Sequence, residues 1–144
     1  MHTHSFQYYL PVNLIFGPGK TELLGEEAVR YGKKVLIVTG RHSTKRSGLL
    51  DRAKSLLEKA GAEVTVFDEV EPNPLASTVM KGAGIVKETG IHVIVGLGGG
   101  SIMDCSKAIA FAACNEGPVF DYIYGKKTGK GALPLILVPT TCGT

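Results

Sequence analysis

The sequence predicts an α/β fold with a Rossmann-like, mostly parallel sheet and flanking helices. Short apolar runs at residues 35–39, 62–67 and 91–97 have the length of buried strands. Longer amphipathic stretches alternate with these runs, and glycine or proline stands at the junctions, which is the rhythm of β-α-β units in a parallel sheet. With 144 residues, of which 44% are hydrophobic, the chain can bury the core of one ordinary domain.

The first part of the chain is expected to form an N-terminal strand ribbon over residues 6–10 and 12–16, bent at the proline between them. A helix at about residues 21–31 follows a Gly-Pro-Gly turn. Residues 35–39 read Val-Leu-Ile-Val-Thr. Such a continuous β-branched run is typical of a strand that is buried on both faces of a sheet.

The middle of the chain continues the alternation. Residues 48–60 carry leucine and alanine at helical spacing, and Gly61 stands where a helix C-cap is expected. Residues 62–67 then form the second strand. Segment 68–74 is acidic and contains two prolines, and because a proline disfavours helix in the residue before it, we expect a loop there. The remaining elements expected are a helix over residues 75–89, a strand over 91–97, a helix over 101–113 and a short strand over 135–138.

Composition argues against several classes of partner. The 16 Lys and Arg against 13 Asp and Glu give a net charge of +3, which is too mild to indicate nucleic acid or a membrane. No apolar run is long enough to span a bilayer, and the N-terminus lacks the features of a signal peptide. Three cysteines without a CxxC pair favour reduced thiols, so a cytoplasmic protein is expected.

The loop Gly98-Gly99-Gly100-Ser101 carries the first chemical signal. It lies between a predicted strand and a predicted helix, where open α/β sheets bind ligands. Glycine lets the backbone approach an anion, and the first amides of a helix favour a phosphate. The spacing differs from GxGxxG, because Ser101 occupies the last glycine position. In the alternative interpretation, Ser101 and Asp104 form a variant capping box with Lys107 paired to Asp104. Asp104 remains a candidate for contact with the cofactor.

The loop after the first parallel strand is basic. Residues 40–46 read Gly-Arg-His-Ser-Thr-Lys-Arg, and no acidic residue occurs between Thr39 and Leu50. An acid there usually accepts hydrogen bonds from the ribose of NAD, whereas arginine or lysine accommodates the 2′-phosphate of NADP. Gly40, Arg41 and Ser43 are therefore candidates for the adenosine ribose, and NADP(H) is favoured over NAD(H). The alternative is a solvated basic loop that leads into a helix.

Polar residues at two further strand ends are candidates for the same site. Asn73, between two prolines, is placed either to recognise an adenine edge or a ribose, or to bond its own backbone in a turn. Thr140 and Thr141 follow the last strand, where their hydroxyls are expected near a pyrophosphate or the nicotinamide ribose. The four histidines form no HxxxH pattern, so we assign no metal ligand and no catalytic residue in this chain.

Three ordered motifs carry a resemblance to a known family. They are GGGSxxDxxK over residues 98–107, Glu-Pro-Asn-Pro over 71–74 and Pro-Thr-Thr-x-Gly-Thr over 139–144. Together with residues 11–19 they make the chain resemble the iron-containing (group III) alcohol dehydrogenases, and the resemblance runs through essentially all of the sequence. Three motifs at compatible spacing are more specific than one glycine loop.

The resemblance implies a dinucleotide site. Residues 98–101 would meet the pyrophosphate, and Thr140, Thr141 and Thr144 the phosphate and nicotinamide side. Asn73 would take the adenosine half. Gly40 stands where NAD-preferring members tend to have Asp, which agrees with a preference for NADP(H). Members of the family also have an all-helical domain, in which an Asp and three His hold a divalent metal, Fe or Zn.

The activity that the resemblance implies is hydride transfer between NAD(P) and a primary alcohol or aldehyde, with the metal polarising the alcohol oxygen. We expect residues 1–144 to be the dinucleotide-binding domain of a truncated family member whose metal-binding helical domain is missing, and the chain alone to be inactive. A homodimer is considered as well. The alternatives are a stand-alone nucleotide- or phosphate-binding module, and a relative similar to glycerol dehydrogenase or dehydroquinate synthase.

Overall fold

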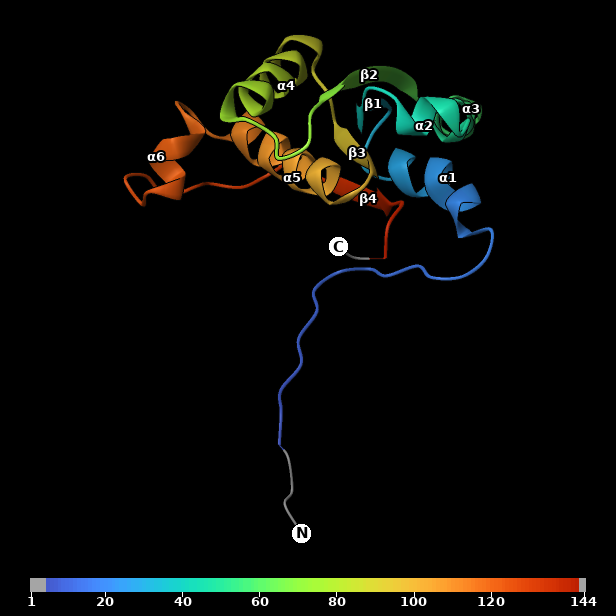
Figure 1. Cartoon of the computed structure of the whole chain (residues 1–144), viewed down its shortest axis with the longest axis horizontal. Coiled ribbons are helices and arrows are strands. Elements are labelled where there is room, and N and C mark those ends of the chain that lie inside the picture. The colour runs from blue at the N-terminus through green and yellow to red at the C-terminus, as the bar shows by residue number, and fades with distance from the viewer. Residues whose placement is uncertain (1–4, 143–144) are drawn as a thin grey trace.

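A computed structural model describes residues 5–142 of the chain. Its centre is a parallel sheet of four strands in the order β2-β1-β3-β4, with helices on both sides (Figure 1). The predicted α/β class with a parallel sheet is therefore confirmed. The strands are β1 (Lys34–Gly40), β2 (Glu63–Val70), β3 (Val93–Gly98) and β4 (Leu135–Pro139).

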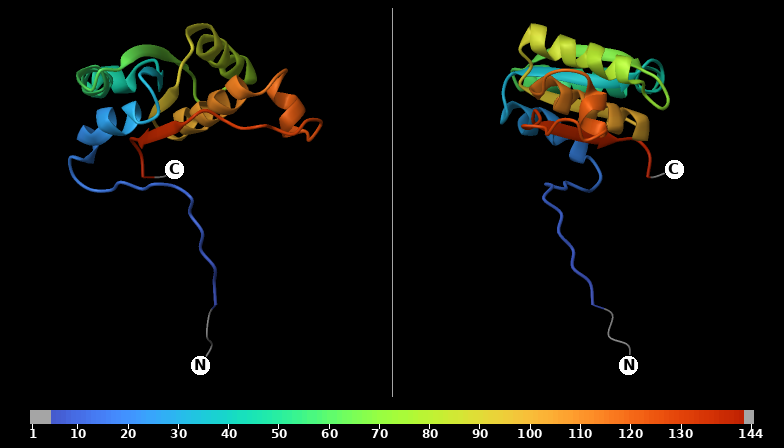
Figure 2. Two further views of the ribbon diagram at one scale, coloured as in Figure 1. Left: turned by 180° about the vertical axis from the view of Figure 1, so that it is seen from behind. Right: turned by 90° about the vertical axis from the view of Figure 1, so that its left-hand side faces the viewer.

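Helices connect the strands and form the outer layers. Helices α1 and α3 cover one face of the sheet, and α4 and α5 cover the other (Figure 2). Among the described residues, no helix combines the length and the apolar character that crossing a membrane requires. The helices are the 3-10 turn η1 (Lys20–Leu23), α1 (Leu24–Val29), α2 (Ser43–Arg46), α3 (Leu49–Lys59), α4 (Ala76–Thr89), α5 (Gly100–Cys114) and α6 (Val119–Ile123).

The strand order creates a crevice at the centre of the sheet. From β1 the chain passes through α2 and α3 to β2 on one side, whereas from β3 it passes through α5 to β4 on the other. Connections that leave two neighbouring strands in opposite directions open a gap beyond their carboxyl ends, and open α/β sheets bind ligands in such gaps. The carboxyl ends of β1 and β3 therefore mark the place for a ligand.

The central strand β1 is buried on both faces. Val35 and Ile37 pack into the core beneath α1 and α3, while Leu36 and Val38 pack into the core beneath α4 and α5. All four side chains have no accessible surface. Because successive residues of a strand point to opposite faces, a strand between two helix layers needs apolar residues at every position. This explains the unbroken apolar run in the sequence.

The expected N-terminal strand ribbon is wrong, since residues 5–16 form no strand. A strand needs a neighbour that satisfies its backbone amides and carbonyls, and no described strand pairs with this segment. Its side chains are exposed, with relative accessibilities of 89% for Phe6 and 91% for Phe16. The segment extends away from the sheet (Figure 1), and we call residues 5–16 the N-terminal arm.

Other boundaries also differ from the prediction. Strand β2 continues to Val70, so residues 68–70 are strand and not loop, because β1 extends to Gly40 and pairs there with Val70. The first helix is shorter than expected and begins as a 3-10 turn. Residues 43–46, expected in a loop, form α2, and the sequence pattern shows no sign of α6. Helices of one turn are too short to display an apolar period.

The packing of α1 on α3 can be tested at Gly25. A Cβ there would lie 2.3 Å from the carbonyl oxygen of Leu56 on α3, so the helices approach too closely for any side chain. We expect Gly25→Ala to lower the free energy of unfolding by about 1–3 kcal/mol, as measured by urea denaturation. Gly84→Ala on α4 is the control, because a Cβ there meets no atom within 4 Å, and alanine should raise the stability by about 0.5–1 kcal/mol. If both substitutions changed the free energy of unfolding in the same direction, the close contact between α1 and α3 at Gly25 would be contradicted.

Candidate functional site

The glycine loop, residues 98–101, connects β3 to α5 at the centre of the sheet. Gly98 ends β3 with a φ of 150°, which residues with a side chain rarely adopt. A Cβ on Gly98 would also lie 2.6 Å from Cγ1 of Ile102 in α5. Glycine at this position therefore lets the chain turn directly from the strand into the helix.

The next two glycines line an open space at the start of α5. Gly99 is the N-cap residue, and Gly100 is the first residue of the helix. A Cβ on Gly100 would meet no atom within 4 Å, and one on Gly99 would lie 3.8 Å from Cγ2 of Thr141. The first amides of a helix have no partner within it and carry the positive end of its dipole. The space next to Gly100 therefore suits a phosphate.

Ser101 does not cap α5, so the capping-box interpretation is wrong. The helix begins one residue earlier than expected, at Gly100, and its N-cap makes no side-chain hydrogen bond. Oγ of Ser101 instead accepts a hydrogen bond from the amide of Asn73 at 3.2 Å. This bond joins the turn after β2 to the glycine loop, and it does not use the hydroxyl proton of Ser101, which can be donated to an anion.

Asp104 lies farther along α5. Its Oδ1 is 3.6 Å from Nζ of Lys107, and both side chains are exposed, so the expected pairing is present. Asp104 lines a hollow of about 360 Å³ between α4, α5 and α6, together with Pro74. Among the predicted site residues within positions 5–142, Asp104 is therefore the one that the structure places beside α6 and not against the strand ends.

Asn73 sits in a tightly held turn after β2. Its φ is 53°, in the left-handed region that asparagine tolerates better than most residues. The carboxylate of Glu71 accepts hydrogen bonds from the amide of Leu75 and the hydroxyl of Thr78, each at 2.8 Å. These bonds lower the pKa of the Glu71 carboxyl, and the bond from the amide of Leu75 is the largest cause. The exposed carboxamide of Asn73 makes no hydrogen bond to a described residue, so the self-bonded turn is not supported.

Helix α2 holds the basic residues at the carboxyl end of β1. Thr44 is buried, and its Oγ1 lies 2.8 Å from Oγ1 of Thr39 in β1. The Thr39 hydroxyl donates to the carbonyl of Leu97 at 2.8 Å, so Thr44 must be the donor in the first bond. Helix α2 is thereby fixed to the ends of both central strands, with Arg41 and Ser43 exposed.

An acidic residue that the sequence prediction did not count lies beside the basic segment. Lys45 on α2 forms an ion pair with Asp68 of β2. The hydrogen bond from Lys45 is the largest cause of the lowered pKa of Asp68, and the charge of Arg41 also contributes. The signal that points to Asp68 is the parallel pairing of the first two strands, which places their carboxyl ends side by side. This region is therefore less positive than its local sequence indicates.

The threonines after β4 lie against the glycine loop. Pro139 is the register partner of Gly98, and the amide of Thr140 donates to the carbonyl of Gly98 at 2.9 Å. Thr141 contacts the position of Gly99, as described above. Thr144 was also predicted for this side and lies outside the described residues. The parallel pairing of β3 and β4 thus brings together two motifs that are far apart in the sequence.

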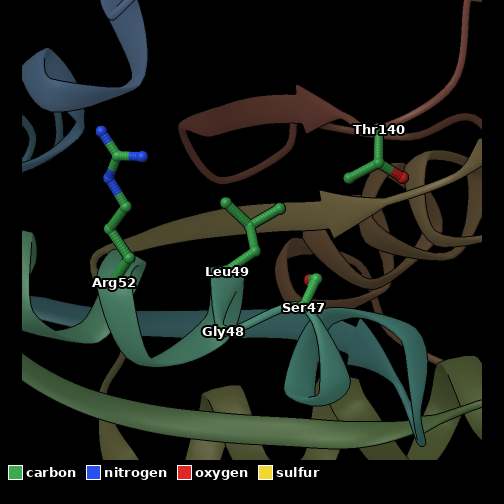
Figure 3. A pocket seen from close by; sticks show the side chains of 5 residues that line it. All are labelled: Ser47, Gly48, Leu49, Arg52 and Thr140. Atoms are coloured by element: carbon green, nitrogen blue, oxygen red, sulfur yellow. The ribbon is translucent and has the colours of Figure 1, made fainter.

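Thr140 also lines a hollow that the sequence prediction missed. The hollow has a volume of about 390 Å³, and its other lining residues are Ser47, Gly48, Leu49 and Arg52 at the start of α3 (Figure 3). No motif marks these residues, because their proximity to Thr140 depends on the packing of α3 over the sheet. Because Thr140 also bonds to Gly98 of the glycine loop, the hollow adjoins the loop and extends the candidate site.

The described residues do not fit the metal that the resemblance implies. Within residues 5–142 no group of three or more His, Cys, Asp or Glu side chains is arranged to hold a metal ion. Burial raises the pKa of the Cys105 thiol to about 11, so this thiol stays protonated and is a poor metal ligand. We derive no chemical step through a metal from these residues.

Sequence comparison shows which known proteins the chain is similar to. The family profile described as "Iron-containing alcohol dehydrogenase" matches residues 11–144. Over 140 residues the chain is 48% identical to the probable NADH-dependent butanol dehydrogenase 1 of Bacillus subtilis, and the match covers 97% of this chain and 36% of that protein. The chain thus spans about a third of the length of this curated relative.

Solved structures agree with the sequence comparison. The NADH-dependent butanol dehydrogenase A of Thermotoga maritima superposes with a TM-score of 0.88 at 35% identity, over 94% of this chain and 34% of that one. A sulfoacetaldehyde reductase from Bifidobacterium kashiwanohense, solved in complex with NAD⁺, superposes with a TM-score of 0.83 at 30% identity, over 99% of this chain and 38% of that one. The motifs, the fold and both comparisons lead to one conclusion, that this chain belongs to the iron-containing alcohol dehydrogenase family.

Proposed function

We propose that this chain binds a dinucleotide across the carboxyl ends of β1, β3 and β4, with the pyrophosphate on the glycine loop. The observation that carries the proposal is the open space next to Gly100, at the N-terminus of a helix of 15 residues and beside the central crevice of the sheet. Backbone amides of the loop and the hydroxyl of Ser101 donate to the phosphate oxygens. Even one methyl group on Gly100 would occupy this space.

Residues at the neighbouring strand ends complete the proposed site. Asn73 takes the adenosine half, because its turn is bonded to Ser101. Thr140 and Thr141 take the pyrophosphate and the nicotinamide side, because they adjoin the glycine loop. Asp104 has the weakest support, since it faces the hollow beside α6. The proposed set is Gly40, Arg41, Ser43, Asn73, Gly98, Gly99, Gly100, Ser101, Asp104, Thr140, Thr141 and Thr144.

For the whole protein we propose hydride transfer between NAD(P) and a primary alcohol or aldehyde. The names of the relatives, which are butanol dehydrogenases, support this substrate class. The bound nicotinamide accepts or donates the hydride, while residues 1–144 act as one domain that binds and orients the cofactor. A metal-dependent step would use residues other than the proposed cofactor-binding residues of this chain. A cytoplasmic location is proposed as well, because Cys105, Cys114 and Cys142 are free thiols.

The substrate class is tested by steady-state assays of the complete gene product. Oxidation of NADPH or NADH is followed by absorbance with butanal, and reduction of NADP⁺ or NAD⁺ with butanol, glycerol and a polyol phosphate. We expect the highest kcat/KM with the simple alcohol and aldehyde. A preference for glycerol would place the protein in a different class of dehydrogenase and would overturn the proposal.

We also propose that NADP(H) is preferred over NAD(H), although the butanol dehydrogenases compared above are named as NADH-dependent. Gly40 presents no carboxylate that would repel a 2′-phosphate. Arg41 has no salt-bridge partner among the described residues, so its guanidinium can bind the phosphate. Lys45 is engaged with Asp68, and the preference therefore rests on Arg41.

A homodimer formed through the N-terminal arm is proposed as well. Apolar side chains occupy every second position of the arm from Phe6 to Phe16, which would place them on one face if the arm were an extended strand. A second copy can cover that face and pair with its backbone, and no strand of the described residues does so. The exposed apolar residues on this face are Phe6, Tyr8, Leu10, Val12, Leu14 and Phe16. Tyr9 and Ile15 would lie on the other face.

Substitution of Gly100 separates cofactor binding from folding. Because a Cβ there meets no protein atom within 4 Å but enters the proposed phosphate position, we expect Gly100→Ala to leave the unfolding midpoint unchanged. The same substitution should weaken NADPH and NADH binding about tenfold, which corresponds to about 1.4 kcal/mol, in calorimetric titrations. Gly84→Ala is a helical control with equally open surroundings and should leave both affinities unchanged. Undiminished binding by Gly100→Ala would contradict the proposed phosphate position.

An acid at position 40 should reverse the proposed cofactor preference. The nearest atoms to a Cβ on Gly40 would lie at 3.5 Å, an ordinary contact, so substitution leaves the fold intact. We expect Gly40→Asp to weaken NADPH relative to NADH about tenfold, because the carboxylate repels the 2′-phosphate and accepts a bond from the ribose. Dissociation constants are measured by fluorescence titration, and Gly40→Asn is the uncharged control. Tighter binding of NADH than of NADPH by the unmodified chain would refute the preference.

Charge on the apolar face of the arm should dissociate the proposed dimer. We expect the double substitution Tyr8→Lys and Leu14→Lys to give monomers where the unmodified chain gives dimers, since the lysines lie on the face to be buried. Light scattering coupled to size-exclusion chromatography measures the mass. Gln7→Lys with Asn13→Lys adds the same charge to the other face and should leave the dimer in place. Equal dissociation by both pairs, or a monomeric unmodified chain, would count against the arm as the interface.

A further inference from the structure

We propose that Asp68 determines how strongly this chain distinguishes NADPH from NADH, because its carboxylate holds the ammonium of Lys45 and competes with the 2′-phosphate for it. This inference rests on the proposed dinucleotide site. It adds to that site a residue that no sequence motif singled out.

The sheet places Asp68 beside the proposed position of the ribose. Strands β1 and β2 are parallel neighbours, with Val38 beside Phe67 and Gly40 beside Val70, and a register shift between these pairs. Asp68 therefore lies level with the end of β1. Phe67 belongs to the core beneath α4 and α5, and because successive side chains alternate between faces, Asp68 points to the other face, where it meets Lys45 of α2.

Lys45 reaches Asp68 because α2 is anchored. The hydroxyl of the preceding residue, Thr44, bonds to that of Thr39 in β1 at 2.8 Å, and both side chains are buried. Helix α2 therefore keeps its place at the end of β1. A ribose next to Gly40 would have the Lys45–Asp68 pair beside it.

The surrounding charges decide whether loss of the Asp68 carboxylate favours NADPH or NADH. Hydrogen bonds are the largest causes of the lowered pKa values of Asp68, from Lys45, and of Glu71, from Leu75, and the charge of Arg41 lowers both pKa values further. Arg41 and Lys45 therefore share this end of the sheet with Asp68 and Glu71, and the nearby Glu69 is paired with Lys81. Loss of the Asp68 carboxylate leaves the positive charges in excess and frees the ammonium of Lys45. A 2′-phosphate gains from both changes, whereas an uncharged ribose hydroxyl gains little.

The Lys45–Asp68 ion pair contributes little to the stability of the fold. A change in nucleotide binding by a variant at position 68 can therefore be separated from a change in folding. Relative side-chain accessibilities are 46% for Lys45 and 37% for Asp68, and exposed pairs of this kind contribute less than about 1 kcal/mol. A variant at position 68 should therefore have the unfolding midpoint of the unmodified chain.

The experiment compares Asp68→Asn with Glu69→Gln. Glu69 is the next residue of β2, and it pairs with Lys81 of α4 at 2.5 Å, with similar accessibilities of 44% and 56%. Each variant removes one carboxylate charge from the same strand, but only Asp68→Asn frees Lys45. Calorimetric titrations of the chain with NADPH and with NADH at low salt give the ratio of the dissociation constants. We expect Asp68→Asn to shift this ratio about fivefold in favour of NADPH, and Glu69→Gln to leave it unchanged.

A double variant identifies the group through which Asp68 acts. When Lys45→Gln is added to Asp68→Asn, the gain for NADPH should disappear, because no ammonium is left to be freed. Unfolding midpoints of all variants, measured in parallel, show that the shift in the ratio does not come from a change in stability. Retention of the full gain in the double variant would overturn the role of Lys45.

The remaining outcomes separate this inference from the proposed function. If both nucleotides bind but Asp68→Asn changes their ratio no more than Glu69→Gln, or lowers the affinity for NADPH, Asp68 does not limit the preference and the inference is overturned while the dinucleotide site stands. If the unmodified chain binds neither nucleotide at millimolar concentration, the proposed function fails, and the inference fails with it.

Discussion

The parallel pairing of β1 with β3 is the contact on which the candidate site depends. The strands are in register from Val35 beside Val93 to Thr39 beside Leu97, and the helices that follow them cross to opposite faces of the sheet. The carboxyl ends of the two strands therefore meet beneath a gap. The bond from the Thr39 hydroxyl to the Leu97 carbonyl, at 2.8 Å, closes the base of this gap. Helix α2 and the glycine loop stand on its two sides, so any shift of β1 against β3 would separate them.

Close contact between β3 and α5 gives the glycines of the strand and of the glycine loop different tasks. A Cβ on Gly96 would lie 2.6 Å from Oγ of Ser106, and a Cβ on Gly98 would lie 2.6 Å from Cγ1 of Ile102. The start of α5 is thereby held against the end of β3, beside the gap. Gly98 is required by the backbone and by this contact, whereas Gly100 is surrounded by open space. Neighbouring glycines that look alike in the sequence thus serve packing in one case and are free to serve a ligand in the other.

Strand β2 distributes its acidic residues between the two helix layers. Asp68 pairs with Lys45 of α2, while Glu69 pairs with Lys81 of α4. Glu71, just beyond the strand, bonds the start of the following helix through Leu75. The charge next to the proposed ribose position is therefore the sum of contributions from segments on both sides of the sheet edge. A count of acids and bases along one loop cannot supply that sum, because Coulomb interactions depend on distance in space.

Local pattern alone determined the elements whose burial is uniform or periodic. The apolar runs of β1 and β3 and the helical spacing in α3 predicted those elements, and the glycine loop marked the turn from β3 to α5. The N-terminal arm also carries apolar side chains at every second position, and yet residues 5–16 form no strand, because a strand depends on a partner for its backbone as well as on its own side chains. Only the tertiary structure decided that Asp68 meets Lys45, that the Asn73 amide bonds to Ser101 and that Thr141 adjoins Gly99. The physical reason is that each of these contacts joins segments far apart in the chain, and the order of the strands in the sheet sets which strand ends become neighbours.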